Sequence, residues 1–156
     1  MNALDIARMF PKAAAWARER ETDILLSGTV LTAGGIAIAE AVGVLHPERV
    51  RVAYVRSMPE PKDSELRAAL RAYFSMEHVS GVTFGYGIYM RGEAEGCEPF
   101  ILAHELRHVY QYEQAGSIEA FLAAYLSQVI ESGYAEAPYE IDAMIASAPY
   151  RNGSGK

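Results

Sequence analysis

The chain of 156 residues is poor in cysteine, and Cys97 is its single thiol. One cysteine cannot form an internal disulfide, and without a Cys-x-x-Cys pair the chain lacks the usual thiolate zinc and redox motifs. Small secreted domains are often held together by several disulfides, so this composition favours a reducing compartment. We therefore expect a cytoplasmic protein.

Basic residues are also scarce. Fourteen lysines and arginines stand against 20 aspartates and glutamates, which gives a net charge of −6 at pH 7. A chain of this sign is not attracted to phosphate backbones or to anionic lipid. We expect neither a nucleic-acid partner nor a role at a membrane surface.

Long uncharged hydrophobic runs are nearly absent as well. The longest apolar stretch, residues 25–45, is diluted by four glycines and carries Glu40 inside it. We expect a buried helix preceded by a turn there, rather than a membrane span. The first ten residues show no secretory signal pattern.

The chain does contain enough apolar residues for one core, since 51% of its residues are hydrophobic. Apolar periodicity and capping residues predict the elements of a single α+β domain with a small mixed sheet. The expected helices cover residues 11–26, 32–43, 99–114, 117–132 and 138–148, with another beginning at 64; the expected strands cover residues 49–55 and 82–90. We expect the domain to extend over residues 1–148 and residues 149–156 to form a loose tail.

The strand expected at residues 82–90 has an unusual feature. Its apolar residues alternate with others along the whole segment, and Gly85 and Gly87 share one face. Glycines on one face of a strand indicate that something approaches closely there. Either the strand offers its edge to an extended peptide, or a helix of the chain packs tightly against it.

The most informative residues are His104-Glu105-Leu106-Arg107-His108, which form the pattern H-E-x-x-H inside the helix expected at residues 99–114. Residues four apart lie on one helix face, so both imidazoles can reach one metal ion. Glu105 lies about 100° around the helix, where it can hold a water molecule in an open cleft without binding the metal. The pattern therefore predicts a zinc site.

Catalytic zinc usually has three protein ligands, and no histidine follows His108. The third ligand is therefore expected among the downstream acidic residues, which are Glu113, Glu119, Glu131, Glu136, Glu140 and Asp142. We favour Glu140, because it lies in the first turn of a helix that can return antiparallel to the motif helix. Glu136 remains the alternative.

The residues around the motif form a larger pattern: His104 to Gln111, then Gly133-Tyr134, then the run Pro-Tyr-Glu-Ile-Asp-Ala at 138–143. This combination resembles the gluzincin group of zinc metallopeptidases. In particular it is similar to small bacterial HExxH domains in the core of toxin-associated contractile-injection proteins. The resemblance extends over about residues 80 to 145. It implies a single-domain α+β fold of the zincin type, with zinc ligands at His104, His108 and Glu140 and with Glu105 as general base. Met144 stands where larger gluzincins often have an acidic residue.

These expectations lead to a function. We expect a zinc-dependent peptidase, or a minimal peptidase-like domain, that hydrolyses peptide bonds with a zinc-activated water. Tyr134 and Tyr139, near the third ligand, are candidate donors to the oxyanion. The partner would be a peptide or protein substrate, with a partner protein or a second copy of the chain as further candidates. The alternative is a non-catalytic interaction module that retains the zinc site.

Overall fold

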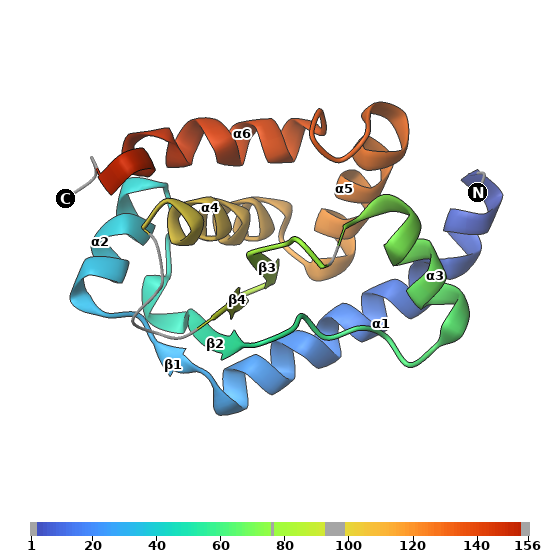
Figure 1. Cartoon of the computed structure of the whole chain (residues 1–156), viewed down its shortest axis with the longest axis horizontal. Helices are drawn as coiled ribbons and strands as arrows, with labels where there is room; N and C mark the ends of the chain where they lie inside the picture. Colours follow the sequence, from blue (N-terminus) through green and yellow to red (C-terminus); the bar gives the residue numbers. More distant parts are fainter. Residues whose placement is uncertain (1–2, 76, 93–98, 154–156) are drawn as a thin grey trace.

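A computed structural model of the chain describes residues 3–75, 77–92 and 99–153. These residues form an α+β fold with a small mixed sheet, as the sequence predicts (Figure 1). The α-helices are α1 (Ala3–Ser27), α2 (Ala33–Ala41), α3 (Ser64–Tyr73), α4 (Pro99–Ala115), α5 (Ile118–Ser132) and α6 (Pro138–Ser147). The strands are β1 (Thr29–Val30), β2 (Arg51–Val55), β3 (Gly81–Phe84) and β4 (Gly87–Arg91). Cys97 lies outside the described residues.

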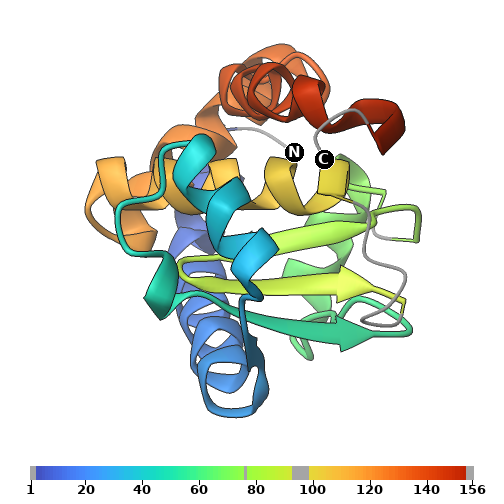
Figure 2. The same cartoon turned by 90° about the vertical axis from the view of Figure 1, so that its left-hand side faces the viewer.

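The four strands lie in the order β1-β2-β4-β3 (Figure 2). β2 runs parallel to β4, whereas β1 pairs antiparallel with β2 and β3 antiparallel with β4. This order places β3 at one edge of the sheet, where it contacts α4.

The single strand expected at residues 82–90 is wrong, because β3 and β4 form a hairpin with Gly85 and Tyr86 at its turn. Gly85 has a φ of +63°, which glycine adopts without strain at a two-residue hairpin turn. The other glycine of the pair, Gly87, lies against Ile24 of α1, where a Cβ would come within 2.9 Å of Ile24 Cδ1. Of the two explanations for the glycines, close packing of a helix is the one seen at Gly87.

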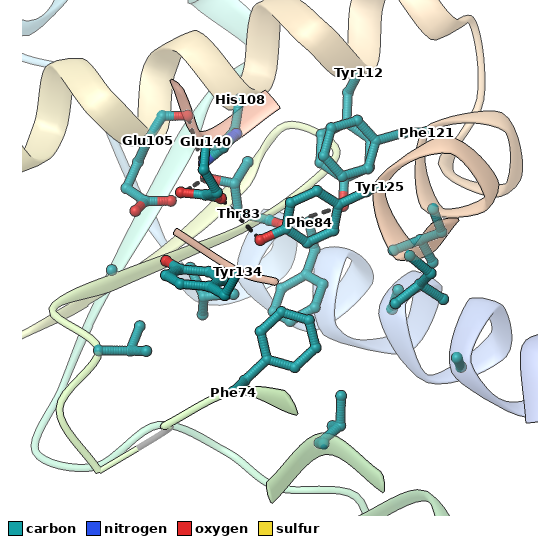
Figure 3. Close-up of a pocket in the computed structure, with 18 of the residues that line it drawn as sticks. Phe74, Thr83, Phe84, Glu105, His108, Tyr112, Phe121, Tyr125, Tyr134 and Glu140 are labelled. Carbon is teal, nitrogen blue, oxygen red and sulfur yellow. Dashed lines mark hydrogen bonds and ion pairs between the residues drawn. The ribbon is translucent and has the colours of Figure 1, made fainter. Parts of the chain in front are cut away.

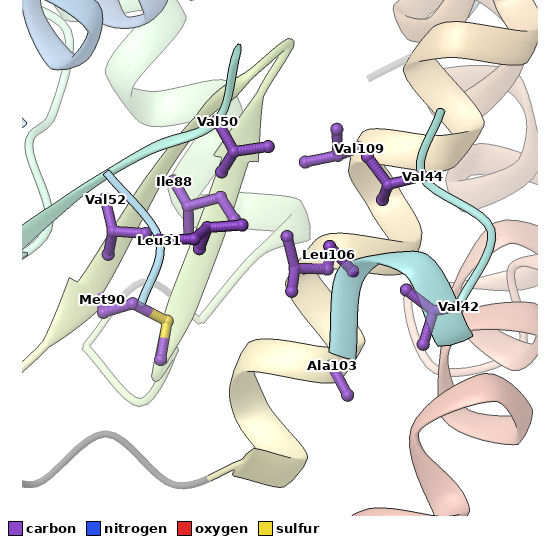
Figure 4. Close-up of a cluster of buried hydrophobic side chains, with 11 residues drawn as sticks. Leu31, Val42, Val44, Val50, Val52, Ile88, Met90, Ala103, Leu106 and Val109 are labelled. Carbon is purple, nitrogen blue, oxygen red and sulfur yellow. The ribbon is translucent and has the colours of Figure 1, made fainter. Parts of the chain in front are cut away.

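Helices cover both faces of the sheet. Figure 1 shows α1 on one side and α4 on the other, with α6 lying outside α4. The apolar core between the sheet and α4 is built around fully buried Val50, Ile88, Leu106 and Val109, and residues of α2 close its far side (Figure 4). This packing fixes the position of the helix that carries the H-E-x-x-H motif.

Two element boundaries differ from the prediction. Helix α1 begins by Ala3 instead of at Pro11, which lies within the helix on its exposed side. The carbonyl that Pro11 leaves without a helical partner belongs to exposed Ala7, so water can satisfy it. Residues Ala148–Gly153 form a 3₁₀ helix against α4 rather than a loose tail, because Tyr150 packs on the main core.

In the described ranges, no helix has the length and apolar character that crossing a bilayer requires. The apolar stretch at residues 25–45 divides among the end of α1, β1 and α2. Helix α2 begins as predicted, with the hydroxyl of Thr32 accepting a hydrogen bond from the backbone N–H of Gly35 at 3.0 Å.

Candidate metal centre

The H-E-x-x-H motif lies in the middle of α4, and its side chains point in different directions. Leu106 faces the sheet core, whereas His104 and His108 face α6 one turn apart. The two imidazoles approach with 3.2 Å between their Nε2 atoms. The helical spacing therefore does bring two nitrogen donors to one point.

Helix α6 brings a carboxylate to the same point. Glu140 Oε1 lies 3.0 Å from His104 Nε2, and Glu140 Oε2 lies 3.0 Å from His108 Nε2. The helix reaches this position because Gly133, with a φ of +82°, ends α5, and Pro138 starts α6 after a short turn. The side chain of Glu140 is only 6% exposed, so it is held here by the fold.

The other acidic candidates point elsewhere. Glu113 accepts hydrogen bonds from the backbone of residues 45 and 46, Glu119 pairs with Arg18, Glu131 contacts Ser127, Asp142 pairs with Arg107, and Glu136 is exposed. Within the described residues, His104, His108 and Glu140 are the group whose donor atoms lie close enough to share an ion.

The spacing of these donors fits a metal ion. Ligands about 2.0–2.1 Å from tetrahedral zinc lie about 3.3 Å from one another. The observed separations of 3.0 to 3.2 Å are close to this edge length, and all three ligand atoms lie within 4.8 Å of each other. The three residues could therefore hold a metal ion with little movement.

The electrostatics of the cluster also suit a cation. Burial by itself would lower the pKa of His108, but the hydrogen bond and charge of Glu140 raise it to about 9. Burial by itself would raise the pKa of Glu140, but the hydrogen bonds of Glu140 with His104 and His108 hold its pKa well below the ordinary value. The carboxylate is thus ionised at neutral pH and attracts positive charge, which a metal ion can supply in place of a proton.

Glu105 is buried, whereas the sequence predicts it in an open cleft. It is only 5% exposed, and its Oε2 accepts a hydrogen bond from the hydroxyl of Thr83 on β3 at 2.7 Å. Its side chain lies over Gly81, where an added Cβ would come within 2.7 Å of Glu105 Cγ. The edge strand therefore fixes the carboxylate of Glu105 beside the cluster, and Glu105 is not one of the three residues whose donor atoms could share an ion.

Two residues that the sequence reasoning missed hold the ligands in place. The Tyr125 hydroxyl donates to Glu140 Oε2 at 2.8 Å, and Gln111 Oε1 lies 2.7 Å from His108 Nδ1. The amide nitrogen of Gln111 donates to the backbone oxygen of Tyr139 and to Asp142 Oδ2 on α6. Such hydrogen bonds orient metal ligands. The i, i+3 spacing from His108 to Gln111 could have indicated a contact between these two side chains on one helix. No local pattern in the sequence indicates the contact of Tyr125 with Glu140.

The two candidate oxyanion donors lie in different surroundings. Tyr134 is 40% exposed and lines the same cavity as Glu140. Burial, together with the charge of Glu140, raises the pKa of Tyr134 well above its ordinary value, so the hydroxyl keeps its proton. The Tyr139 ring instead stacks on Phe121, with 5.1 Å between ring centroids. Of the two, the structure brings Tyr134 to the cluster.

A cavity of about 120 Å³ opens beside the cluster (Figure 3). Glu105, His108, Glu140 and Thr83 lie at one end of it, and the remaining walls are mostly aromatic and aliphatic. The site thus combines a polar end that could hold a metal ion with space for part of a ligand.

We compared the chain with models of protein families, with curated proteins and with solved structures, and none of them matches.

Proposed function

We propose that the protein is a zinc-dependent peptidase whose site has the arrangement of the gluzincin group, on a zincin-like fold. One observation carries this proposal: two histidines one helical turn apart on α4 meet a buried carboxylate from α6, with Glu105 beside them. Two imidazoles and one carboxylate form a donor set used by catalytic zinc, which leaves a fourth position for water. His104, His108 and Glu140 would hold the ion.

A zinc ion in such a site supplies Lewis acidity, which polarises a carbonyl and makes water a better nucleophile near neutral pH. Glu105 acts as general base: its carboxylate accepts a proton from the attacking water and then passes that proton to the leaving amine. The hydrogen bond from Thr83 occupies Oε2 of Glu105, so Oε1 is the oxygen that receives the proton. The protonated hydroxyl of Tyr134 donates to the developing oxyanion.

The edge of β3 gives a substrate backbone somewhere to bind. This strand is one of the two edge strands of the sheet, and two of its residues, Gly81 and Thr83, contact Glu105. An extended peptide that pairs with β3 would place its backbone next to the general base. The substrate class is accordingly an extended segment of a peptide or of an unfolded protein.

The test joins metal content with cleavage. We expect wild-type protein loaded with zinc to cleave an unfolded protein substrate, and Glu105→Gln to keep its zinc while losing about 10²–10⁴-fold in kcat/KM. The amide keeps the size of the side chain but cannot accept the proton. Equal cleavage by wild type and Glu105→Gln would refute the mechanism.

The second candidate function is a metal-binding interaction module. It is favoured by the near-complete burial of His108 and Glu140, whose side chains are 8% and 6% exposed. Bound zinc without cleavage of any peptide in a broad library would select this function.

A further inference from the structure

The cavity beside the cluster is hollow because small side chains line part of it. Ala13 and Ala17 of α1 stand on its wall, one helical turn apart, where longer side chains would fill the space. The rest of the wall comes from other elements, including Phe74 after α3, Val82 of β3 and Leu126 of α5. Unfilled apolar space destabilises a folded protein, and an apolar ligand that enters it recovers the lost contacts.

The polar groups of the cavity lie at one end only. Thr83, Glu105, His108 and Glu140 gather there, and Figure 3 shows the rings of Phe74 and Tyr134 on the side of the cavity away from α4. A ligand with a polar backbone and one apolar side chain matches this division. The backbone would lie at the cluster and the side chain would point toward α1.

We propose that the cavity binds one large apolar side chain of the peptide, next to the bond that is cut. Calling this peptide the substrate rests on the proposed function. A cavity of about 150 Å³ lined by apolar side chains binds benzene, so a volume of about 120 Å³ suits a single ring or a branched aliphatic chain, as in phenylalanine or leucine.

The charges around the cavity also favour an uncharged side chain. Glu105 at the polar end repels an acidic side chain, whereas the charge of Glu140 is balanced by its pairing with His104 and His108. A lysine or arginine that entered the apolar part would lose its water without gaining a partner there. The preferred side chains are therefore large and uncharged.

The fluorescence of a tryptophan in the cavity wall can report this binding. Trp16 is the single tryptophan of the chain and lines the cavity, edge-on to Phe84 with 5.3 Å between ring centroids. We expect N-acetyl-phenylalanine amide and N-acetyl-leucine amide to change the emission of Trp16 in a saturable way. N-acetyl-aspartic acid amide should leave it unchanged. The titration is done with zinc-loaded and with metal-free protein, so it does not depend on cleavage.

Two variants fill the cavity without touching the cluster. Ala13→Leu adds atoms from α1, and Leu122→Phe adds them from α5, so one remains if the other fails to fold. Each should raise the Kd of the phenylalanine probe about tenfold or more, since a buried apolar side chain is worth that much. The matched control is Ala7→Leu, on the exposed side of the same helix, which should bind like wild type.

Cleavage gives an independent result. Mass spectrometry of products from a mixed peptide library should show phenylalanine, leucine or methionine at one fixed position beside each cut. Cavity-filling variants should shift this preference toward smaller residues.

The outcomes separate the two proposals. Absence of any cleavage that depends on Glu105 overturns the proposed function, while the emission of Trp16 still decides whether the cavity takes apolar side chains. Cleavage that depends on Glu105 but shows no preference for large apolar residues, or equal Trp16 responses to the phenylalanine and aspartic acid probes, overturns the inference about the cavity.

Discussion

Helix α4 has one face with apolar contacts and one face with polar contacts. On one face Ala103, Leu106 and Val109 are fully buried against the sheet and α2 (Figure 4). On the other face His104 and His108 meet α6 through hydrogen bonds and ion pairs. Apolar burial is non-directional and stabilises the helix in place without any ligand, whereas the polar contacts each depend on a particular partner atom.

The polar face is also tied together as a network. Arg107 forms a two-point ion pair with Asp142 and donates to the backbone oxygen of Val42, while Gln111 joins His108 to α6. This network sets the register of α6 on α4, and with it the position of Glu140. The comparison teaches that substitutions on the apolar face should change stability, and those on the polar face should change metal binding.

The largest expected effect on stability is at Leu106. Leu106→Ala should lower the free energy of unfolding of the metal-free protein by about 2–5 kcal/mol, because it leaves a cavity in a filled core. Denaturant unfolding measures this change. The matched control is Leu26→Ala at an 82% exposed position, which should stay within about 0.5 kcal/mol of wild type. A large loss of zinc affinity in folded Leu106→Ala, with little loss of stability, would contradict the division between the faces.

Removing the metal should have the next largest effect. Zinc at 100 to 1,000 times its Kd should add about 2.7–4.1 kcal/mol to the stability, because it binds the folded state. After chelation the melting temperature should fall, but the far-ultraviolet circular dichroism should remain that of a folded protein. Complete unfolding on chelation would show that the apolar face of α4 does not suffice to hold the helix.

Gln111 tests the polar face without removing a ligand. Gln111→Ala should weaken zinc binding about 10–100-fold, because His108 loses the hydrogen bond that orients its ring. Gln114→Ala, at an exposed position of the same helix, is the matched control. Metal titration of the two metal-free variants measures the difference, and equal affinities would mean that the hydrogen bond to His108 is dispensable.

The smallest effect is expected outside both faces. Thr32 caps α2, which covers the apolar side of α4, and Thr32→Ala should cost about 1 kcal/mol of stability. Thermal unfolding measures the change, and Thr32→Ser is the control that keeps the capping oxygen. Zinc affinity should be the same in all three proteins; a change in it would show that the two faces are coupled through α2.

The sequence predicts the local part of this structure best. The sequence predicts that His104 and His108 share one face of a helix, and their Nε2 atoms do lie 3.2 Å apart, because this spacing acts over a single turn. The hairpin of β3 and β4 was missed because a turn of two residues preserves the alternation of apolar residues, so that pattern continues from Phe84 to Ile88 as if the strand did. Only Gly85 marked the turn.

Contacts between distant segments were the least predictable. The hydrogen bond from Tyr125 to Glu140 joins two helices, and that from Thr83 to Glu105 joins a strand edge to a helix. Nothing in the local sequence indicates either pair, because both depend on how the elements pack. Glu140 is the acidic residue that lies close to the two histidines, as the expected antiparallel return of its helix predicts; that it binds a metal stays a prediction.

The most direct test of the account is a titration of zinc into metal-free protein, with wild type beside Glu140→Gln and Glu136→Gln. The account predicts about one ion per chain for wild type and for Glu136→Gln, whose side chain is exposed. Glu140→Gln should lose more affinity than the roughly 10–100-fold expected for a residue that only supports a ligand. Wild-type affinity in folded Glu140→Gln, or an equal loss in Glu136→Gln, would contradict the claim that α4 and α6 together build the metal site.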